Sequence, residues 1–194
     1  ASSVSKSSKG AGGAIFITWS KVFTSRNCKS VSNQATLGNG GTISVESMTF
    51  TDLFACSFIN NSAGLNGGAV NSKDVQYLTI IMSVFSDQIS NGSGGALHTF
   101  VTVGFQIYLV YLQKTVFKFN TAILIGSAVH SEFIDNIALL EAEFVSNVAG
   151  DKGGAIMIIF EPSKKSVLVL HKCQFVINSG WCSDMLNTQY LSQF

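Results

Sequence analysis

The sequence has little charge, almost no proline and no long apolar run, and these absences exclude whole classes of protein. Only 12% of the 194 residues are charged, the net charge is +1, and Arg26 is the single arginine. A nucleic-acid-binding surface needs clustered lysine and arginine, so nucleic acid is not an expected partner. No apolar stretch approaches the ~20 residues of a membrane helix, so the chain is not expected to span a membrane.

The sequence also has no cysteine pattern that is typical of a metal site. Its 4 cysteines form no CxxC pair, and none lies at ligand spacing from the 3 histidines. We therefore expect no metal and no cofactor. Cys173 and Cys182, near the end of the chain, are candidates for a disulfide, and so are Cys28 and Cys56. For Cys56 and Cys173, packing in the core is the favoured interpretation.

What the sequence does have is a repeat. A Gly-Gly-Ala-aliphatic tetrapeptide, or a near copy, recurs at steps of 28, 27, 27, 32 and 27 residues. The copies begin at Gly12, Gly40, Gly67, Gly94, Gly126 and Gly153; the second glycines include Gly68, Gly95 and Gly154, and Ser127 replaces one of them. A fixed period in this range is the signature of a solenoid.

Two further residue types keep register with the glycines. A large apolar residue stands nine positions before the pair, and an amide follows it three positions later. The apolar series is Val31, Phe58, Phe85, Phe117 and Phe144, continued by Phe175; the amide series is Gln34, Asn61, Gln88, Asn120, Asn147 and Asn178. Aliphatic residues with the strand period of two precede each Phe, so each unit offers three short strands separated by polar corners.

Three strands and three corners per turn of about 27 residues predict an all-β coil of parallel strands with about seven turns. The predicted division is a Ser-rich linker over 1–9, the repeat domain over 10–180, and a cap or the start of a continuation over 181–194. The first glycine of each pair predicts a corner with positive φ. The amide column predicts a ladder at another corner, with Asn in the left-handed region. Lys114, Glu141 and Lys172 share a column and predict an outward ladder of alternating charge.

The combination Phe-x-x-Asn followed by Gly-Gly-Ala-(Ile/Leu/Val) resembles the repeats of the polymorphic outer-membrane proteins, a family of bacterial autotransporter adhesins. Similar repeats occur in large surface proteins of protists. The copies that carry the resemblance are Phe58 to Val70, Phe85 to Leu97, Phe117 to Val129 and Phe144 to Ile156. The resemblance implies a right-handed, single-stranded parallel β-helix of the pectate-lyase-like kind, displayed at the cell surface.

The expected function is therefore that of a non-catalytic extracellular repeat protein, structural or adhesive, forming a segment of a surface scaffold or filament. Its expected partners are copies of itself or other repeat segments, with glycans or cell-surface proteins as further candidates. The alternative is a carbohydrate-active enzyme, either a lyase or a hydrolase, or a glycan-binding module. A hydrolase needs a close pair of carboxylates, and the eleven acidic residues are scattered along the chain. No catalytic residue is assigned.

Two smaller features of the sequence are a pair of glycosylation sequons and a pair of histidines. Asn60 and Asn91 begin glycosylation sequons. His98 and His130 stand at the same place in their repeats and are expected to stack on neighbouring turns. Because the preceding aliphatic residue points inward, both imidazoles are predicted to be exposed. They form either a metal-binding or pH-sensitive contact or, as favoured, a pair of exposed polar residues.

Overall fold

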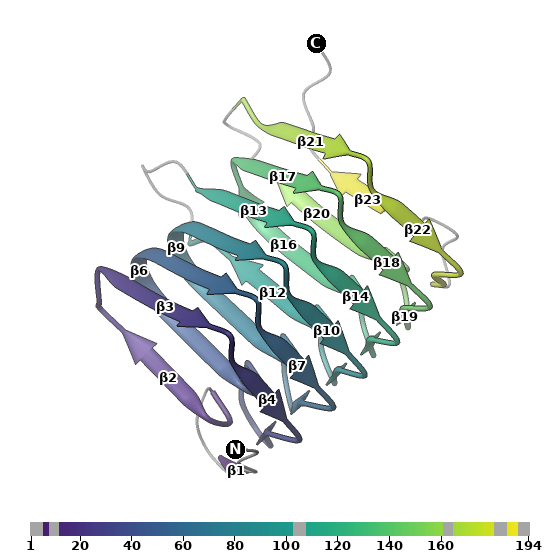
Figure 1. The fold of residues 1–194 in the computed structure, drawn as a ribbon. Helices are drawn as coiled ribbons and strands as arrows, with labels where there is room; N and C mark the ends of the chain where they lie inside the picture. The colour runs from purple at the N-terminus through teal and green to yellow at the C-terminus, as the bar shows by residue number, and fades with distance from the viewer. Residues whose placement is uncertain (1–5, 8–11, 103–107, 161–164, 181–185, 190–194) are drawn as a thin grey trace.

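The chain winds into a stack of parallel strands, as the ribbon in Figure 1 shows. The computed structural model describes residues 6–7, 12–102, 108–160, 165–180 and 186–189. The predicted all-β parallel solenoid is confirmed, and the described residues contain no helix. Two of the three sheets are six strands deep, and the solenoid has about 5 turns where seven were predicted. Turns longer than the basic repeat contribute to the difference, since Phe85 and Phe117 are partners on adjacent turns although 32 residues separate them.

The first sheet holds the short strands that follow the amide column. Its order is β1-β5-β8-β11-β15-β19. The strands are β1 (Lys6–Ser7), β5 (Gln34–Ala35), β8 (Ser62–Ala63), β11 (Ile89–Ser90), β15 (Thr121–Ala122) and β19 (Val148–Ala149). Strand β1 belongs to the segment for which the sequence predicted a linker.

The second sheet carries the phenylalanine column. Its order is β22-β18-β14-β10-β7-β4. The strands are β4 (Lys29–Val31), β7 (Ser57–Ile59), β10 (Val84–Ser86), β14 (Val116–Lys118), β18 (Glu143–Val145) and β22 (Gln174–Val176). In the first turn the register puts Ser30, and not Val31, beside Phe58. The sequence assignment was wrong by one residue because the corner between Ala35 and Gly40 is one residue longer than its counterpart in the next turn.

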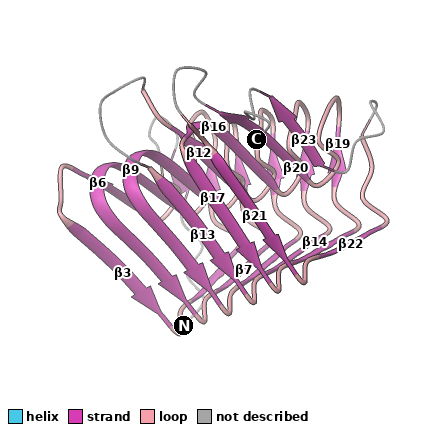
Figure 2. Cartoon of the chain, turned by 90° about the horizontal axis from the view of Figure 1, so that it is seen from above, coloured by secondary structure: helices cyan, strands magenta, loops and turns pink. Residues whose placement is uncertain are grey.

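The third sheet has 11 strands and forms two walls, seen from above in Figure 2. The long strands β6 (Ile43–Phe54) and β9 (Val70–Ile81) run through the corner between the walls and join them. One wall holds β2 (Ile15–Thr18), β12 (Leu97–Phe100), β16 (Val129–Ile134), β20 (Ile156–Phe160) and β23 (Leu186–Gln189). The other holds β3 (Val22–Arg26), β13 (Leu109–Gln113), β17 (Asn136–Leu140) and β21 (Val167–His171). Strand β23 pairs in parallel with β20, and so continues the wall within 181–194.

The core is built of stacked like residues. Rings of Phe58, Phe85, Phe117, Phe144 and Phe175 stack with centroid distances of 4.7, 4.9, 5.1 and 4.9 Å. The first four are at most 2% exposed. Offset aromatic pairs of this kind contribute about 0.5–1.5 kcal/mol beyond their buried area. The aliphatic residue after each glycine motif forms a second column, and the register aligns its members from Ile15 to Ile156.

In the described part of the chain, a residue with positive φ marks the glycine corner and the amide corner of each turn. At one corner this is the first glycine of each pair, with φ between 62° and 76°, as predicted. At the amide corner the prediction needs a correction, because the left-handed residue is the one before the amide, for example Asn60 or Phe119. The amide itself is thereby free to turn inward.

The amide column is a buried ladder of side-chain hydrogen bonds. Asn120 Oδ1 accepts the backbone N–H of Gln88 at 3.1 Å, and its Nδ2 donates to Asn147 Oδ1 at 2.9 Å and to the carbonyl of Phe85 at 3.1 Å. Asn33 and not Gln34 begins the column, because Asn33 Nδ2 donates to Asn61 Oδ1 at 3.1 Å. Since an unpaired buried amide costs about 1–3 kcal/mol, the ladder fixes which residues stack.

The charge column lies on the outside, as predicted. Lys114 Nζ is 4.0 Å from Glu141 Oε2, and both side chains are about half exposed. Exposed pairs of this kind contribute about 0–1 kcal/mol. The pair therefore confirms the register between β13 and β17 without adding much stability.

Replacing Phe85 by alanine is expected to lower the free energy of unfolding by about 3–5 kcal/mol, because the ring is fully buried between two others. Phe119→Ala is the matched control, since that ring is 53% exposed. Urea unfolding followed by circular dichroism measures both. Similar losses in the two variants would contradict the stacked column.

Replacing Asn120 by aspartate tests the ladder without changing the side-chain size. The carboxylate cannot donate to Asn147 Oδ1 or to the Phe85 carbonyl, and it buries an uncompensated charge. We expect a loss of about 3–5 kcal/mol at neutral pH. An exposed asparagine at the same corner two turns earlier gives the control, Asn60→Asp, which is expected to change stability by less than about 0.5 kcal/mol. Equal effects of the two substitutions would refute a structural ladder.

Candidate functional site

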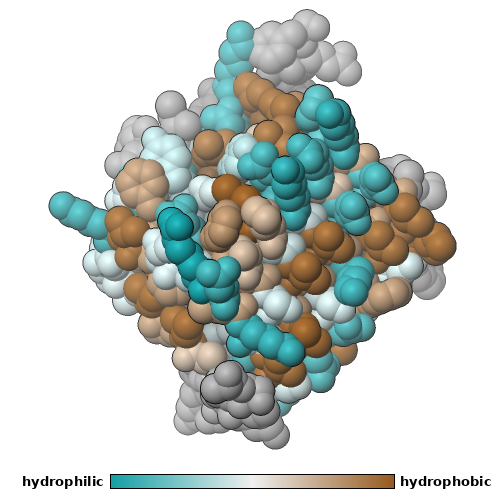
Figure 3. Space-filling model, viewed as in Figure 1, coloured by the Kyte–Doolittle hydropathy of each residue, from teal (hydrophilic) through white to brown (hydrophobic). Residues whose placement is uncertain are grey.

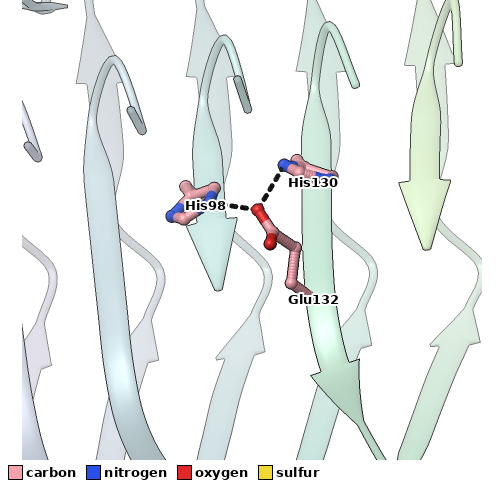
Figure 4. A group of neighbouring side chains, drawn as sticks. All are labelled: His98, His130 and Glu132. Atoms are coloured by element: carbon pink, nitrogen blue, oxygen red, sulfur yellow. Dashed lines mark hydrogen bonds and ion pairs between the residues drawn. The ribbon is translucent and has the colours of Figure 1, made fainter. Parts of the chain in front are cut away.

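Three ionisable side chains meet on the outer face of the wall formed by β12 and β16. They are His98, His130 and Glu132, and Figure 4 shows both imidazoles beside the carboxylate. The register pairs His98 with His130, as their equal positions in the repeat predicted. Glu132 follows His130 by two residues, so it lies on the same face of β16. The sequence analysis missed Glu132, although the spacing of two from His130 was a usable signal.

The prediction that the two imidazoles are exposed is wrong. His98 is 5% exposed and His130 is 1% exposed. Both point away from the core as predicted, but the glycine corner of their own turn folds over them. A Cβ atom at Gly126 would lie 2.8 Å from His130 Cβ, and one at Gly94 would lie 3.0 Å from His98 Cα. The absence of a side chain at these glycines lets the corner approach closely and bury the histidines.

The hydrogen bonds of the cluster are asymmetric. His98 Nδ1 is 2.9 Å from Asn71 Oδ1, and His98 Nε2 is 3.3 Å from Glu132 Oε1. His130 Nδ1 is 3.4 Å from the same carboxylate oxygen, yet neither ring nitrogen of His130 has a hydrogen-bond partner. The two rings lie 5.3 Å apart with a tilt of 50°. His130 therefore buries polar nitrogen atoms that the protein leaves unsatisfied.

Burial and charge set the protonation of the cluster. Burial, and to a smaller extent the neighbouring His98, lower the pKa of His130 to about 3, although Glu132 opposes the shift. The hydrogen bond with His98 lowers the pKa of Glu132 against the opposing effect of burial. At neutral pH His130 is thus a neutral imidazole next to an ionised carboxylate.

A groove of about 280 Å³ opens beside the cluster. It is lined by Asn39, Asn66, Asn71, Lys73, His98, Phe100 and Glu132. The ammonium of Lys73 is held 2.5 Å from Glu46 Oε1, and this hydrogen bond raises the pKa of Lys73. Glu132 thus meets solvent at the groove, while His130 lies beneath it.

The three side chains are suited to holding a cation. One ligand atom from each lies within 4.8 Å of the other two, and within the described ranges no other group of three His, Cys, Asp or Glu side chains does so. Two imidazoles and a carboxylate are ligands that divalent transition metals accept. Sequence reasoning assigned no metal ligand because it considered the two histidines without a third donor.

A second groove, of about 360 Å³, lies over the charge column. Its lining includes Lys114, Glu141, Glu143 and Lys172. Because Glu141 already pairs with Lys114, the groove is an open surface depression between paired charges. Its two carboxyl groups are those of Glu141, between β17 and β18, and Glu143, at the start of β18.

The remaining predicted site residues divide between described and undescribed parts of the chain. Cys28 and Cys56 are free cysteines, so the pairing of Cys28 with Cys56 is wrong. Cys56 is 2% exposed and packs in the core as favoured. Cys182 lies outside the described residues, and with it the pairing to Cys173. The sequon residues Asn60 and Asn91 are exposed, and their glycosylation stays a prediction.

Comparison with known proteins gives one match. Residues 55–73 match the family model described as the Chlamydia polymorphic membrane protein (Chlamydia_PMP) repeat. The matched stretch contains Phe58, Asn61 and the Gly67–Gly68 pair, so the predicted resemblance to polymorphic membrane protein repeats is confirmed. No curated protein and no solved structure gives a significant match. No helix in the described part of the chain is long and apolar enough to cross a membrane.

Replacing His130 by methionine in chelator-treated protein is expected to raise the free energy of unfolding by about 1–3 kcal/mol, because it removes unsatisfied buried nitrogens. Methionine fits, since Met157 is the register partner of His130 on the next turn and is 2% exposed. His171→Met, at an exposed histidine, is the control and should change little. Denaturant unfolding of the unaltered chain, H130M and H171M measures the three free energies of unfolding. If H130M is less stable than the unaltered chain, the imidazole of His130 is not unsatisfied.

Proposed function

We propose that this chain is a segment of a non-catalytic, extracellular surface scaffold with a structural or adhesive role. The match to a polymorphic membrane protein repeat supports a protein of the outer membrane or cell surface. The observation that carries the proposal is that the buried polar side chains make hydrogen bonds within the protein. In the amide ladder they bond one turn to the next, so their chemistry serves the stack and presents nothing to a substrate.

Several carboxylates are likewise engaged locally. Glu46 binds Lys73, Glu141 pairs with Lys114, and Asp74 accepts hydrogen bonds from Thr102. A retaining glycosidase needs two carboxyl groups about 5–5.5 Å apart and free to act on one bond. Carboxylates that are already bonded to lysine or threonine are not free to act on a substrate. They favour a scaffold over the alternative carbohydrate-active enzyme.

The exterior suits contact with other surface molecules. On the face shown in Figure 3, apolar and polar side chains are interleaved. Large apolar residues project at several corners, among them Leu65, Leu124 and Ile177, which are 50%, 53% and 79% exposed. Such a mixed surface of low charge is compatible with glycans or cell-surface proteins as adhesive partners.

The last turn leaves core residues open. Leu170 of β21 is 41% exposed, whereas its register partner Leu139 is fully buried by the turn above it. Among the described strands, β21 and β22 are also the last on their sides of the sheets. Unpaired strand edges are templates for further pairing, and solenoids need their end turns covered. We infer that another repeat turn of the same kind covers this end, so the working unit is an extended assembly.

The assembly is tested by sedimentation and electron microscopy of the purified protein over a range of concentrations. We expect end-to-end association that grows with concentration and that Leu170→Lys reduces, because the charge would be buried at the joint. Leu65→Lys places the same charge on an exposed corner away from that turn and should leave association unchanged.

Two results would contradict the proposal. A compact monomer at every concentration would exclude end-to-end assembly. Release of reducing ends or unsaturated products from a panel of polysaccharides would replace the scaffold by the carbohydrate-active alternative.

A further inference from the structure

We propose that His98, His130 and Glu132 bind one zinc-class divalent metal ion between adjacent turns, with a fourth coordination position open to the groove. This site goes beyond a scaffold function and does not depend on it. The two histidines come from β12 and β16, and the carboxylate from β16. The ion would therefore join two turns of the solenoid that otherwise meet through backbone hydrogen bonds, packing and side-chain hydrogen bonds such as that of Thr99 to Ser131.

The distances already match two edges of a zinc tetrahedron. For metal–ligand bonds of about 2.0–2.1 Å, the ligand atoms of a tetrahedral site are about 3.3–3.4 Å apart. Glu132 Oε1 lies 3.3 Å from His98 Nε2 and 3.4 Å from His130 Nδ1. An octahedral magnesium site would require edges of about 2.9 Å and mostly oxygen ligands. The third edge closes by rotation of the tilted rings, since all three atoms lie within 4.8 Å.

Hydrogen bonds around His98 orient it as a ligand. Asn71 Nδ2 donates to Ser44 Oγ at 3.3 Å, so Asn71 Oδ1 faces His98 Nδ1 and accepts a hydrogen bond from it. A protonated ring donates a hydrogen bond from Nε2 to the carboxylate, whereas in the neutral ring Nε2 carries a lone pair aimed at the carboxylate. A metal ion between the two atoms would take the place of that proton. A carbonyl-type oxygen that fixes the far nitrogen is the usual support of a metal-bound histidine.

His130 supplies the second and stronger reason. It is 1% exposed, and neither of its nitrogens has a hydrogen-bond partner. A buried polar group is normally satisfied, and an exception calls for an ion, a water or a functional role. A metal bound at Nδ1 would satisfy this nitrogen and neutralise Glu132 in the same step.

The groove provides access. Glu132 is partly exposed and, with His98, lines the groove, so an ion can reach the carboxylate before it meets His130. Lys73, the nearest cationic side chain in the lining, is held by Glu46 and does not occupy the carboxylate. Water or an oxygen ligand in the groove would complete four-fold coordination.

The test uses the 194-residue chain without a histidine tag, stripped with a chelator and titrated with ZnCl₂. We expect one ion per chain, measured by competition with a chromophoric chelator. At a hundredfold excess of zinc over the dissociation constant, the melting temperature should rise by about 5–10 °C. Cobalt(II) in place of zinc should give the intense visible absorption of a tetrahedral site.

Variants distinguish zinc binding at this site from zinc binding by other histidine or cysteine side chains. His130→Met and Glu132→Gln should each weaken zinc binding at least about tenfold and remove the cobalt band. His171→Gln and Cys28→Ser change a histidine and a thiol elsewhere and should leave both signals unchanged. H130M retains a buried side chain already present in the column, so a folded variant is available for comparison.

The proposal is overturned if the stripped protein takes up no zinc, or if H130M and E132Q bind as tightly as the unaltered chain. It is also overturned if the signals disappear in His171→Gln or Cys28→Ser instead. A weak cobalt spectrum typical of six oxygen ligands would reject the tetrahedral assignment.

Discussion

Parallel stacking in register is the constraint on which the rest of this structure depends. Each residue has its own counterpart as a neighbour at about 4.8 Å above and below. Only side chains that pack well against copies of themselves can therefore fill a column. Phenylalanine rings stack, and amides both donate and accept. Identical charges repel, which is consistent with the charged fraction of 12% and with the alternation of Lys114 and Glu141.

The amide ladder is more specific than the aromatic column. A phenylalanine can be exchanged for another apolar residue at the cost of a cavity, whereas a buried amide needs a partner of matching hydrogen-bonding pattern on each side. The ladder accepts another amide side chain in place of asparagine, as Gln88 shows. Its longer side chain keeps the bond to Asn61 and donates to the carbonyl of Phe58 at 2.8 Å.

The histidine cluster is where the stacking rule is broken. Two imidazoles occupy adjacent places in one outer column, and the glycine corner buries both, so no protein group in the described residues makes a hydrogen bond with His130. Local violations of otherwise consistent rules are expected at functional or strained sites. A bound ion would act on the coupling between neighbouring turns. In a solenoid this coupling carries much of the stability, since each turn contacts only the next.

The sequence by itself determined the period, the class of fold and most of the core, because in-register stacking converts spacing along the chain directly into columns in space. The Phe and amide columns from Phe58 onward could be assigned by counting. Counting failed at Ser30 and Asn33, where one extra corner residue shifts the register. The place of Glu132 on the face of His130 could also have been counted, because it follows by two residues. Only the tertiary structure decided that the left-handed residue precedes the amide and that His98 and His130 are buried. These features depend on how the corner backbone of one turn packs against side chains of its own and neighbouring turns, and such contacts leave no regular spacing in the sequence.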